Sequence, residues 1–272
     1  MANDTPFRLV GMLHLPPLPG IPNWRSTPLS QIVDQAVADA VTLTEAGFTH
    51  LMLQNSSDAP AQIVVEPSTV AVMTRIATEV TRATSLPLGI NVAHNDGIAA
   101  LAIAYAVEAA FIRVKVLTGT AVGPAGVMQG CGFSTAELRT RLGADVEIWA
   151  DVNEATSLRL VACDDEWSAI EAVKFGAADA LLVTKDSGVR DALDSVARIR
   201  NILPNIPLLV GGRVTADTIA ITRANADGAV IGGALKPDDA GWFARVDPAL
   251  ARAFIEPVQA DECKLALQSI DG

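Results

Sequence analysis

The sequence predicts a single α/β domain, a (β/α)8 barrel in which eight parallel strands alternate with helices. Three observations lead to this prediction. Short apolar runs recur along the chain and alternate with segments of helical periodicity. Two late runs, 207–212 and 227–233, each end in a Gly-Gly pair, one helix apart. No linker, low-complexity stretch or charge block divides the chain. The alternative architecture is a doubly wound open sheet.

The strand–helix units follow one another in order. Strands are expected at 8–12, 50–54, 88–92, 111–116, 147–152 and 180–184, and within the two runs that end in Gly-Gly. Helices are expected at 30–46, 67–84, 97–109, from 134 onward, and at 166–175, 189–203, 216–224 and 248–254. Ser134 and Glu137 match a capping box, and the segments 117–132 and 153–165 are expected to be loops. The barrel is expected over about 8–236, with a helical cover over 237–272 in the same domain.

Composition restricts the partners and the compartment. Half of the 272 residues are hydrophobic, enough for a large core, and the net charge of −11 makes nucleic acid an unlikely partner. Cys131, Cys163 and Cys263 lack metal-binding or disulfide spacing, which is typical of a reducing compartment. The first four residues do not resemble a signal peptide, and no apolar run reaches about 18 residues. We therefore expect a cytoplasmic protein without a membrane span, cofactor or metal, and a homo-oligomer.

The two Gly-Gly pairs predict a site for a small phosphorylated substrate. Gly211, Gly212, Gly232 and Gly233 lack a Cβ, so backbone N–H groups can come close to a ligand. Loops after the seventh and eighth strands of such barrels frequently bind phosphate. Arg213 directly follows the first pair and is expected to belong to the same site. The alternative is that both pairs form only tight turns.

Charged side chains alternate with aliphatic ones on two neighbouring strands. Arg113 and Lys115 are expected to point into the barrel, and so is Asp151. Two buried cations need anions, so they form either an internal salt-bridge network or a clamp for a substrate anion. Asp151 could be a counter-ion, a metal ligand or a general base, and the cations should lower its pKa. Glu154, on the following loop, could transfer protons or simply be exposed.

Other polar residues follow strand ends, where a barrel places its working groups. His14 and His94 are candidate acid–base groups, or they satisfy local hydrogen bonds. Asp96 could be catalytic or could cap the next helix. Lys185 could form a Schiff base with a carbonyl substrate or pair with an anion. We assign catalysis to Asp151, His94, Asp96, Glu154 and Lys115. We assign substrate binding to His14, Asn55, Asn91, Asn95, Arg113, Lys185, Gly211, Gly212, Arg213, Gly232 and Gly233.

The run 11–20, which contains His-Leu-Pro-Pro-Leu-Pro-Gly, resembles the opening signature of the BtpA family, which includes SgcQ-like proteins. Segments 89–92, 95–96, 111–114, 117–119 and 227–232 resemble the family as well. The resemblance covers nearly all of the chain up to residue 236. It implies a TIM barrel of the ribulose-phosphate-binding kind. The family name refers to photosystem I biogenesis, and members also occur beside sugar-metabolism genes.

The chain departs from the family pattern at several strand ends. It has Gln54 where Glu is usual, His94 where Arg is usual, and Lys115 where Asn is usual. Residues 153–155 replace a Val-Lys-His run, and 184–188 replace a Thr-Gly start. Because strand ends set specificity in barrels, the departures imply a changed substrate or reaction.

Three functions remain open from the sequence. The first is an enzyme for a phosphorylated sugar or nucleotide-like molecule, with glycosyl-bond chemistry of the nucleosidase or glycosyltransferase type preferred over isomerisation. The second is a Schiff-base aldolase that uses Lys185. The third is a non-catalytic assembly or stability factor, which predicts a closed apolar barrel mouth with Arg113 and Lys115 fully paired.

Overall fold

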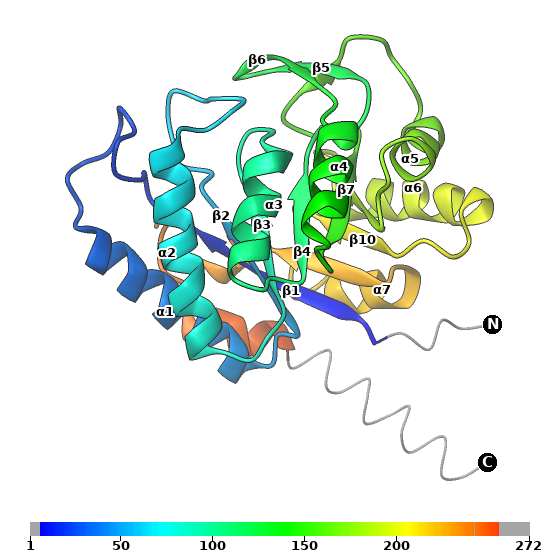
Figure 1. Ribbon diagram of the computed structural model, residues 1–272. Helices are drawn as coiled ribbons and strands as arrows, with labels where there is room; N and C mark the ends of the chain where they lie inside the picture. Colours follow the sequence, from blue (N-terminus) through cyan, green and yellow to red (C-terminus); the bar gives the residue numbers. More distant parts are fainter. Residues whose placement is uncertain (1–5, 242, 256–272) are drawn as a thin grey trace.

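The computed structural model describes residues 6–241 and 243–255. Its parallel strands form a closed barrel in the order β1-β11-β10-β9-β7-β4-β3-β2, which confirms the predicted fold class (Figure 1). Strand β1 pairs with both β2 and β11 and thereby closes the barrel. The barrel strands are β1 (Arg8–His14), β2 (His50–Gln54), β3 (Leu88–Asn91), β4 (Phe111–Val114), β7 (Glu147–Val152), β9 (Ala180–Thr184), β10 (Leu208–Gly211) and β11 (Gly228–Ile231).

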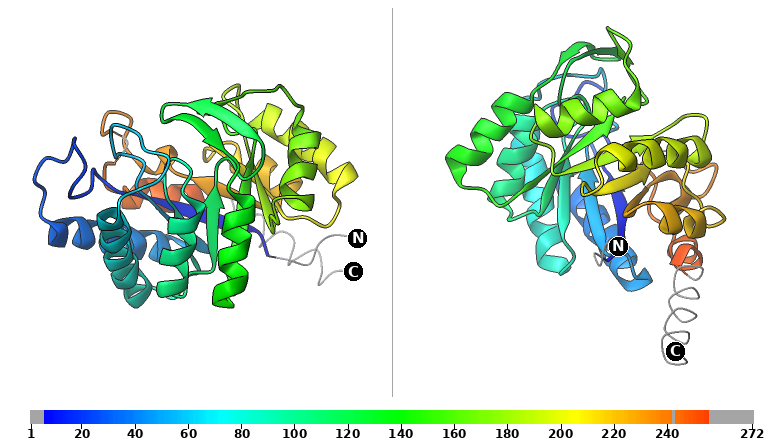
Figure 2. Two further views of the ribbon diagram at one scale, coloured as in Figure 1. Left: turned by 45° about the horizontal axis from the view of Figure 1, so that its top comes forward. Right: turned by 90° about the vertical axis from the view of Figure 1, so that its right-hand side faces the viewer.

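Helices surround the barrel and bury their apolar faces against the strands (Figure 2). They are α1 (Leu29–Ala46), α2 (Pro67–Ala83), α3 (Gly97–Ala106), α4 (Gly132–Leu142), α5 (Asp165–Lys174), α6 (Val189–Ile202), α7 (Ile219–Asn225) and the short η1 (Gly233–Leu235), and residues 248–255 are also helical. Among the described residues, no helix has the length and apolar character needed to cross a membrane. The predicted cover from 256 to 272 lies outside the described residues.

The predicted capping box at Ser134 and Glu137 is wrong. Helix α4 begins earlier, with Cys131 as its N-cap and no side-chain hydrogen bond at the cap. The Ser134 hydroxyl instead donates to the carbonyl of Cys131 at 3.0 Å. A Cβ on Gly132 would lie 3.0 Å from the Leu117 carbonyl oxygen. Close backbone packing, which glycine permits, therefore fixes the start of the helix.

The two segments expected to be loops contain a second, small sheet. Strands β5 (Thr120–Gly123), β6 (Gly126–Gln129) and β8 (Leu158–Arg159) form an antiparallel sheet in the order β6-β5-β8, which we call the cap sheet. Its β5–β6 hairpin stands at the top of Figure 1. Ala121 and Met128 of this sheet form a small apolar cluster with Val116, separate from the barrel core. Loops after two neighbouring barrel strands are thus joined across the C-terminal side of the barrel.

Aromatic side chains fill the N-terminal half of the barrel. The rings of Phe111 and Trp149 stack with their centroids 3.6 Å apart. Gly89 makes room for them, because a Cβ there would lie 2.1 Å from a ring carbon of Phe111. The indole N–H of Trp149 donates to Glu147 at 2.7 Å, and Arg8 pairs with the same carboxylate at 2.8 Å. This packing leaves the C-terminal ends of the strands as the place for a ligand.

Candidate active site

A cavity of about 460 Å³, here called the mouth cavity, opens at the C-terminal ends of the barrel strands. One part of its lining is formed by the last residue of β10 and the residues that follow β10 and β11, which we call the glycine lip: Gly211, Gly212, Arg213, Gly232 and Gly233. Another part is formed by polar residues near the C-terminal ends of β1, β4 and β7: His14, Arg113, Lys115 and Glu154. Both groups of residues thus line one cavity at the same end of the barrel.

The first half of the glycine lip turns sharply away from β10. Gly212 and Arg213 both have left-handed backbone conformations, with φ of 63° and 45°. Within the described residues, the amide N–H groups of these two residues donate to no backbone acceptor. The Arg213 side chain is exposed and lines the cavity. Glycine is needed at 211, because a Cβ there would lie 2.8 Å from the hydroxyl oxygen of Thr184.

The second half of the glycine lip contains two different glycines. A Cβ on Gly232 would lie 2.7 Å from the Cε1 atom of His14, so this glycine lets the imidazole approach the strand end. A Cβ on Gly233 would meet no atom within 4 Å, so this position faces open space. In the described part of the chain, the amide groups of Gly233 and Ala234 also lack a backbone acceptor. The lip thus offers several N–H donors to a ligand.

Arg113 and Asp151 form a bidentate pair across β4 and β7. The Nε and NH2 atoms of Arg113 donate to the two carboxylate oxygens of Asp151 at 2.9 and 2.8 Å. The side chains are 13% and 2% exposed. Burial raises the pKa of Asp151 and outweighs the opposing effect of the Arg113 guanidinium. The expected lowering of this pKa is therefore wrong, because desolvation dominates. The geometry makes Asp151 the counter-ion of Arg113.

Lys115 and Glu154 form a second buried pair. The Lys115 Nζ lies 3.2 Å from Glu154 Oε1, and the Thr156 hydroxyl donates to the same oxygen at 2.6 Å. Burial favours a raised pKa for Glu154, but Lys115 and the hydrogen bonds from Thr156 outweigh it, so the pKa is lowered. The Ser157 hydroxyl favours the anion too, yet no side chain in the described ranges hydrogen-bonds Oε2. The alternative of an exposed Glu154 is wrong, since this residue is 8% exposed.

His14 is held in its neutral form at the base of the mouth cavity. Its Nδ1 lies 3.2 Å from the Nζ of Lys236, and burial, Lys236 and Arg113 together lower its pKa to about 3. Burial also lowers the pKa of Lys236 to about 8, while Asp39 opposes that change. A neutral imidazole cannot act as a general acid in the way that a protonated imidazolium does. Sequence reasoning missed Lys236, whose only signal is a lysine directly after the last apolar run of the barrel.

His94 lies near the Lys115–Glu154 pair but lines neither the mouth cavity nor the cavity beside it. Burial and Lys115 lower its pKa, and Glu154 acts in the opposite direction. Its backbone N–H donates to the Gln62 carbonyl at 2.8 Å. His94 lines a narrow space that Asn55 also lines. The structure therefore separates His94 from the groups that face the cavity.

Four other predicted site residues hold the strand ends and loops in place. Asp96 accepts from the N–H of Ala99 at 2.9 Å, which confirms the helix-capping alternative. Asn95 exchanges two hydrogen bonds with the backbone of Val116, at 2.8 and 3.0 Å. Asn55 accepts from the N–H of residue 93 at 2.8 Å, and the amide of Asn91 donates to the Arg113 carbonyl at 2.8 Å. These side chains hold the backbone around the site in place.

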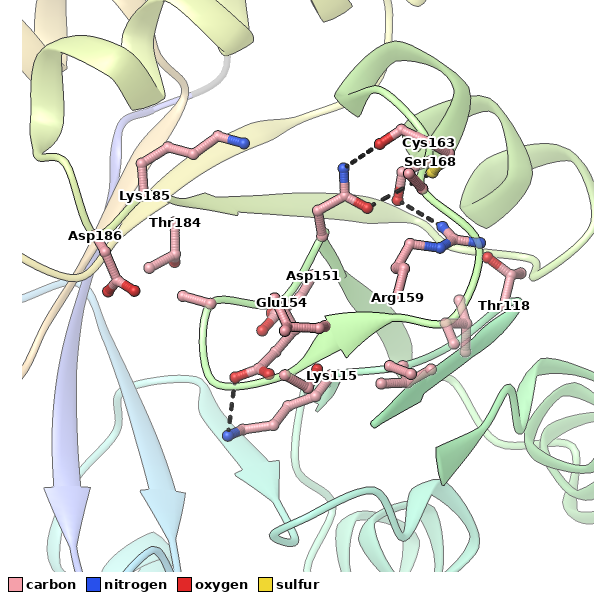
Figure 3. A pocket seen from close by; sticks show the side chains of 18 residues that line it. Lys115, Thr118, Asp151, Glu154, Arg159, Cys163, Ser168, Thr184, Lys185 and Asp186 are labelled. Carbon is pink, nitrogen blue, oxygen red and sulfur yellow. Dashed lines mark hydrogen bonds and ion pairs between the residues drawn. The ribbon is translucent and has the colours of Figure 1, made fainter. Parts of the chain in front are cut away.

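A further cavity of about 420 Å³, here called the side cavity, lies beneath the cap sheet (Figure 3). Lys115, Glu154, Ala155 and Thr184 line both cavities, so they form a shared wall. Lys185 lines the side cavity, and its Nζ lies 2.8 and 2.7 Å from the two oxygens of Asp165. In residues 6–241 and 243–255, no three His, Cys, Asp or Glu side chains converge as a metal site requires.

Comparison with known proteins places the chain in a family. The model of the BtpA family matches residues 6–260. An uncharacterized protein of Pyrococcus horikoshii is 39% identical over 82% of this chain and 85% of its own length. The photosystem I biogenesis protein BtpA of Synechocystis sp. is 30% identical over 91% of this chain and 86% of its own length.

Solved structures share the fold at low sequence identity. A native KDPGal structure gives a TM-score of 0.58 at 15% identity, covering 96% of this chain and 98% of that one. N-(5'-phosphoribosyl)anthranilate isomerase from Pyrococcus furiosus gives a TM-score of 0.54 at 10% identity, covering 93% and 98%. These likenesses concern the fold alone. From the family model and its relatives, the chain belongs to the BtpA family.

Proposed function

We propose that this protein is an enzyme that acts on a phosphorylated sugar or nucleotide-like molecule and makes or breaks its glycosyl bond. One observation carries the proposal. The mouth cavity runs without interruption from the glycine lip to the Lys115–Glu154 pair. A molecule with a phosphate at one end and a reactive carbon at the other fits this arrangement, because anchoring at a distance provides binding energy for the chemistry.

The glycine lip supports the phosphate part of the proposal. The N–H groups of Gly212, Arg213, Gly233 and Ala234 are not used by the backbone of the described residues. Clustered N–H groups in turns form concave sites for anions. The exposed Arg213 side chain adds a positive charge, and it forms no ion pair within the described part of the chain. Arginine binds phosphate oxygens in a two-pronged geometry.

Glu154 supports the chemical part. Lys115 and Thr156 lower its pKa and keep the carboxylate ionised at neutral pH, so it can accept a proton, although the lowered pKa makes it a weaker base. Glu154 takes a proton from water, the hydroxyl adds to the anomeric carbon, and the bond from that carbon to the leaving nitrogen breaks with its electron pair on nitrogen. The proton then passes from Glu154 to that nitrogen. Before it accepts that proton, the Glu154 carboxylate favours the positive charge that develops on the sugar ring.

Binding of ribose 5-phosphate, compared with ribose, tests the phosphate site by calorimetry. The Gly233→Ala variant is the sharpest perturbation, because its Cβ meets no protein atom but enters the space of the ligand. By displacing the phosphate, the added Cβ should break one of its hydrogen bonds. Loss of one hydrogen bond to a charged group costs about 1.5–3 kcal/mol, or roughly tenfold to hundredfold in affinity. Glu166→Gln on the outer surface serves as the control. Equal affinity for ribose and ribose 5-phosphate, or for Gly233→Ala and wild type, would count against the proposal.

Lys185 is poorly arranged for the Schiff-base alternative. Both oxygens of Asp165 lie within 2.8 Å of its Nζ and stabilise the charged ammonium, whereas a Schiff base requires the neutral amine. We therefore expect no borohydride-trapped adduct with carbonyl substrates such as dihydroxyacetone phosphate. A mass increase on Lys185 after trapping would revive the aldolase function.

A role in assembly is the second candidate, supported by the name of the Synechocystis relative and by one surface feature. Leu158, Leu160 and Val161, at and after the β8 end of the cap sheet, are 80%, 66% and 77% exposed. Arg113 and Lys115 are paired internally, as this function predicts, but the mouth is open and carries charged side chains beside its apolar ones. Light scattering of wild type and Leu160→Asp tests whether this face joins copies of the chain. A monomer in both would contradict the expected homo-oligomer.

A further inference from the structure

Gln54, the last residue of β2, lines the mouth cavity and is only 5% exposed. Its backbone carbonyl accepts from the N–H of Leu15 at 2.9 Å, whereas its side-chain carboxamide hydrogen-bonds no residue in the described ranges. Both polar atoms of that carboxamide retain accessible surface, and the mouth cavity is the space that the residue lines. A buried polar group without a partner is unfavourable, so a ligand that pairs with it gains affinity.

Gln54 differs in this respect from the other neutral or acidic side chains of the cavity that are not in ion pairs. Thr184 is half-buried, and Thr215 and Asp238 are exposed, so water can satisfy their polar atoms. The carboxamide of Gln54 has much less access to water. Its hydrogen-bonding capacity is therefore directed at whatever occupies the cavity.

The barrel order places Gln54 between the phosphate end and the reactive end of the cavity. Along one side of the barrel the strands follow one another as β10, β11, β1, β2, β3 and β4, so β2 lies between the glycine lip and the strand before Lys115. Gln54 pairs in register with His14 of β1, and both residues line the cavity. A ligand that extends from the lip to Lys115 therefore has His14 and Gln54 along one side and the end of β9 along the other.

His14 makes this side of the cavity polar without adding a charge. An ammonium group can only donate, so the Lys236 Nζ at 3.2 Å assigns the acceptor role to Nδ1 of the neutral imidazole and the hydrogen to Nε2. A Cβ on Gly232 would lie 3.5 Å from Nε2, so this edge of the ring lies beside the glycine lip. Gln54 thus has a neutral neighbour on the side that faces the phosphate end.

The chemistry of a carboxamide decides which ligand group fits Gln54. The amide nitrogen donates and the amide oxygen accepts, and a hydroxyl group can likewise do both. A phosphate or carboxylate would accept from the nitrogen but leave the oxygen unpaired, and an apolar chain would leave both unpaired. The cations nearest along the barrel, Arg113 and Lys115, are already engaged by Asp151 and Glu154 and do not call for a second anion.

From this placement we infer that Gln54 selects the hydroxyl groups of the sugar: its carboxamide donates to one hydroxyl oxygen of the substrate and accepts from a hydroxyl group. The inference rests on the proposed function and deepens it, because it assigns a protein group to the sugar between the phosphate and the reactive carbon. Phosphate esters of hydroxylated sugars are then bound in preference to phosphate esters of apolar alcohols.

The Gln54→Met variant, with ribose 5-phosphate and 1-pentyl phosphate as ligands, tests this role. Methionine keeps the length of the side chain and removes its donor and acceptor, and 1-pentyl phosphate keeps the phosphate and a five-carbon chain without hydroxyls. By calorimetry, Gln54→Met should bind ribose 5-phosphate about tenfold more weakly than wild type, and 1-pentyl phosphate at least as tightly. Gln31→Met, the same change at an exposed position of α1, should match wild type with both ligands.

Unchanged binding of ribose 5-phosphate by Gln54→Met would overturn the inference. An equal loss for both esters would also overturn it, because a change in cavity shape affects both alike. Wild type alone gives an independent answer if the variant does not fold: equal affinities for the two esters would mean that no protein group reads the hydroxyls.

Ribose without phosphate separates this inference from the proposed function. Ligand-detected NMR should show ribose bound to wild type and more weakly bound to Gln54→Met. If ribose 5-phosphate binds no more tightly than ribose, the phosphate site is wrong, and a weakening of ribose binding in Gln54→Met still supports the role of Gln54. If neither ribose nor ribose 5-phosphate binds wild type, both proposals are wrong.

Discussion

The neutral state of His14 makes the stability of the barrel depend on pH. Its pKa is lowered from 6.5 to about 3 by burial first, and by Lys236 and Arg113 next. At pH values between these two pKa values, His14 is protonated in the unfolded chain and neutral in the folded chain. The contribution is therefore fully present above pH 6.5 and is lost as pH falls toward 3. At pH 5 the loss is about 2 kcal/mol, from about 1.4 kcal/mol per pH unit, and it reaches about 4 kcal/mol at pH 3.

Urea unfolding at pH 7 and pH 5, followed by tryptophan fluorescence, measures this loss. The His14→Gln variant should lose about 2 kcal/mol less than wild type over the same interval, whatever its stability at pH 7. His50 lies at the opposite end of the barrel, and burial lowers its pKa to about 4. The His50→Gln variant should therefore also lose less unfolding free energy than wild type between pH 7 and pH 5, and the effects of the two substitutions should add. Equal pH dependence in wild type and His14→Gln, or a His14 resonance in the folded protein that titrates near 6.5, would refute the reasoning.

Three further substitutions test the packing and the pairs. Gly89→Ala places a Cβ 2.1 Å from a ring carbon of Phe111 and should lower the free energy of unfolding by about 1–3 kcal/mol, measured by urea unfolding. An unchanged midpoint of the urea transition would mean that the Phe111 ring shifts freely. Asp151→Ala leaves the Arg113 guanidinium buried without its partner and should cost about 3–5 kcal/mol in the same assay, and a loss below about 1 kcal/mol would contradict the pairing. Lys185→Ala should bind ribose 5-phosphate within twofold of wild type by calorimetry, since Lys185 does not line the mouth cavity; a tenfold loss would place it in the phosphate site.

The features that follow from local alternation were predictable from the sequence. Arg113, Trp149 and Asp151 face the barrel interior because successive side chains of a strand point to opposite sides. The cap sheet was not predictable in the same way, since β5 pairs with β8, which follows only after a helix and a barrel strand. Its strands are short and rich in glycine. Pairing across the molecule, rather than local preference, therefore decides their conformation.

The candidate site was predictable only in outline. Lys115 and Glu154 were selected from their positions at strand ends, and they line the same cavity as the glycines at the ends of β10 and β11. Their electrostatic states depend on burial that no sequence pattern reports, which explains the wrong pKa direction for Asp151. Asp96 illustrates a further limit, because a carboxylate before a helix has the same sequence signature whether it caps the helix or faces a ligand.

The wall that Glu154 and Ala155 form between the two cavities has a thermodynamic consequence. A ligand that moves either residue from one side changes the shape and charge that the other side presents. The two binding events then share a coupling free energy, which must be the same in both directions. If either ligand orders the wall, the other binds more tightly by the same factor, whichever is added first. A short stretch of backbone can thus make the occupancy of one cavity depend on that of the other.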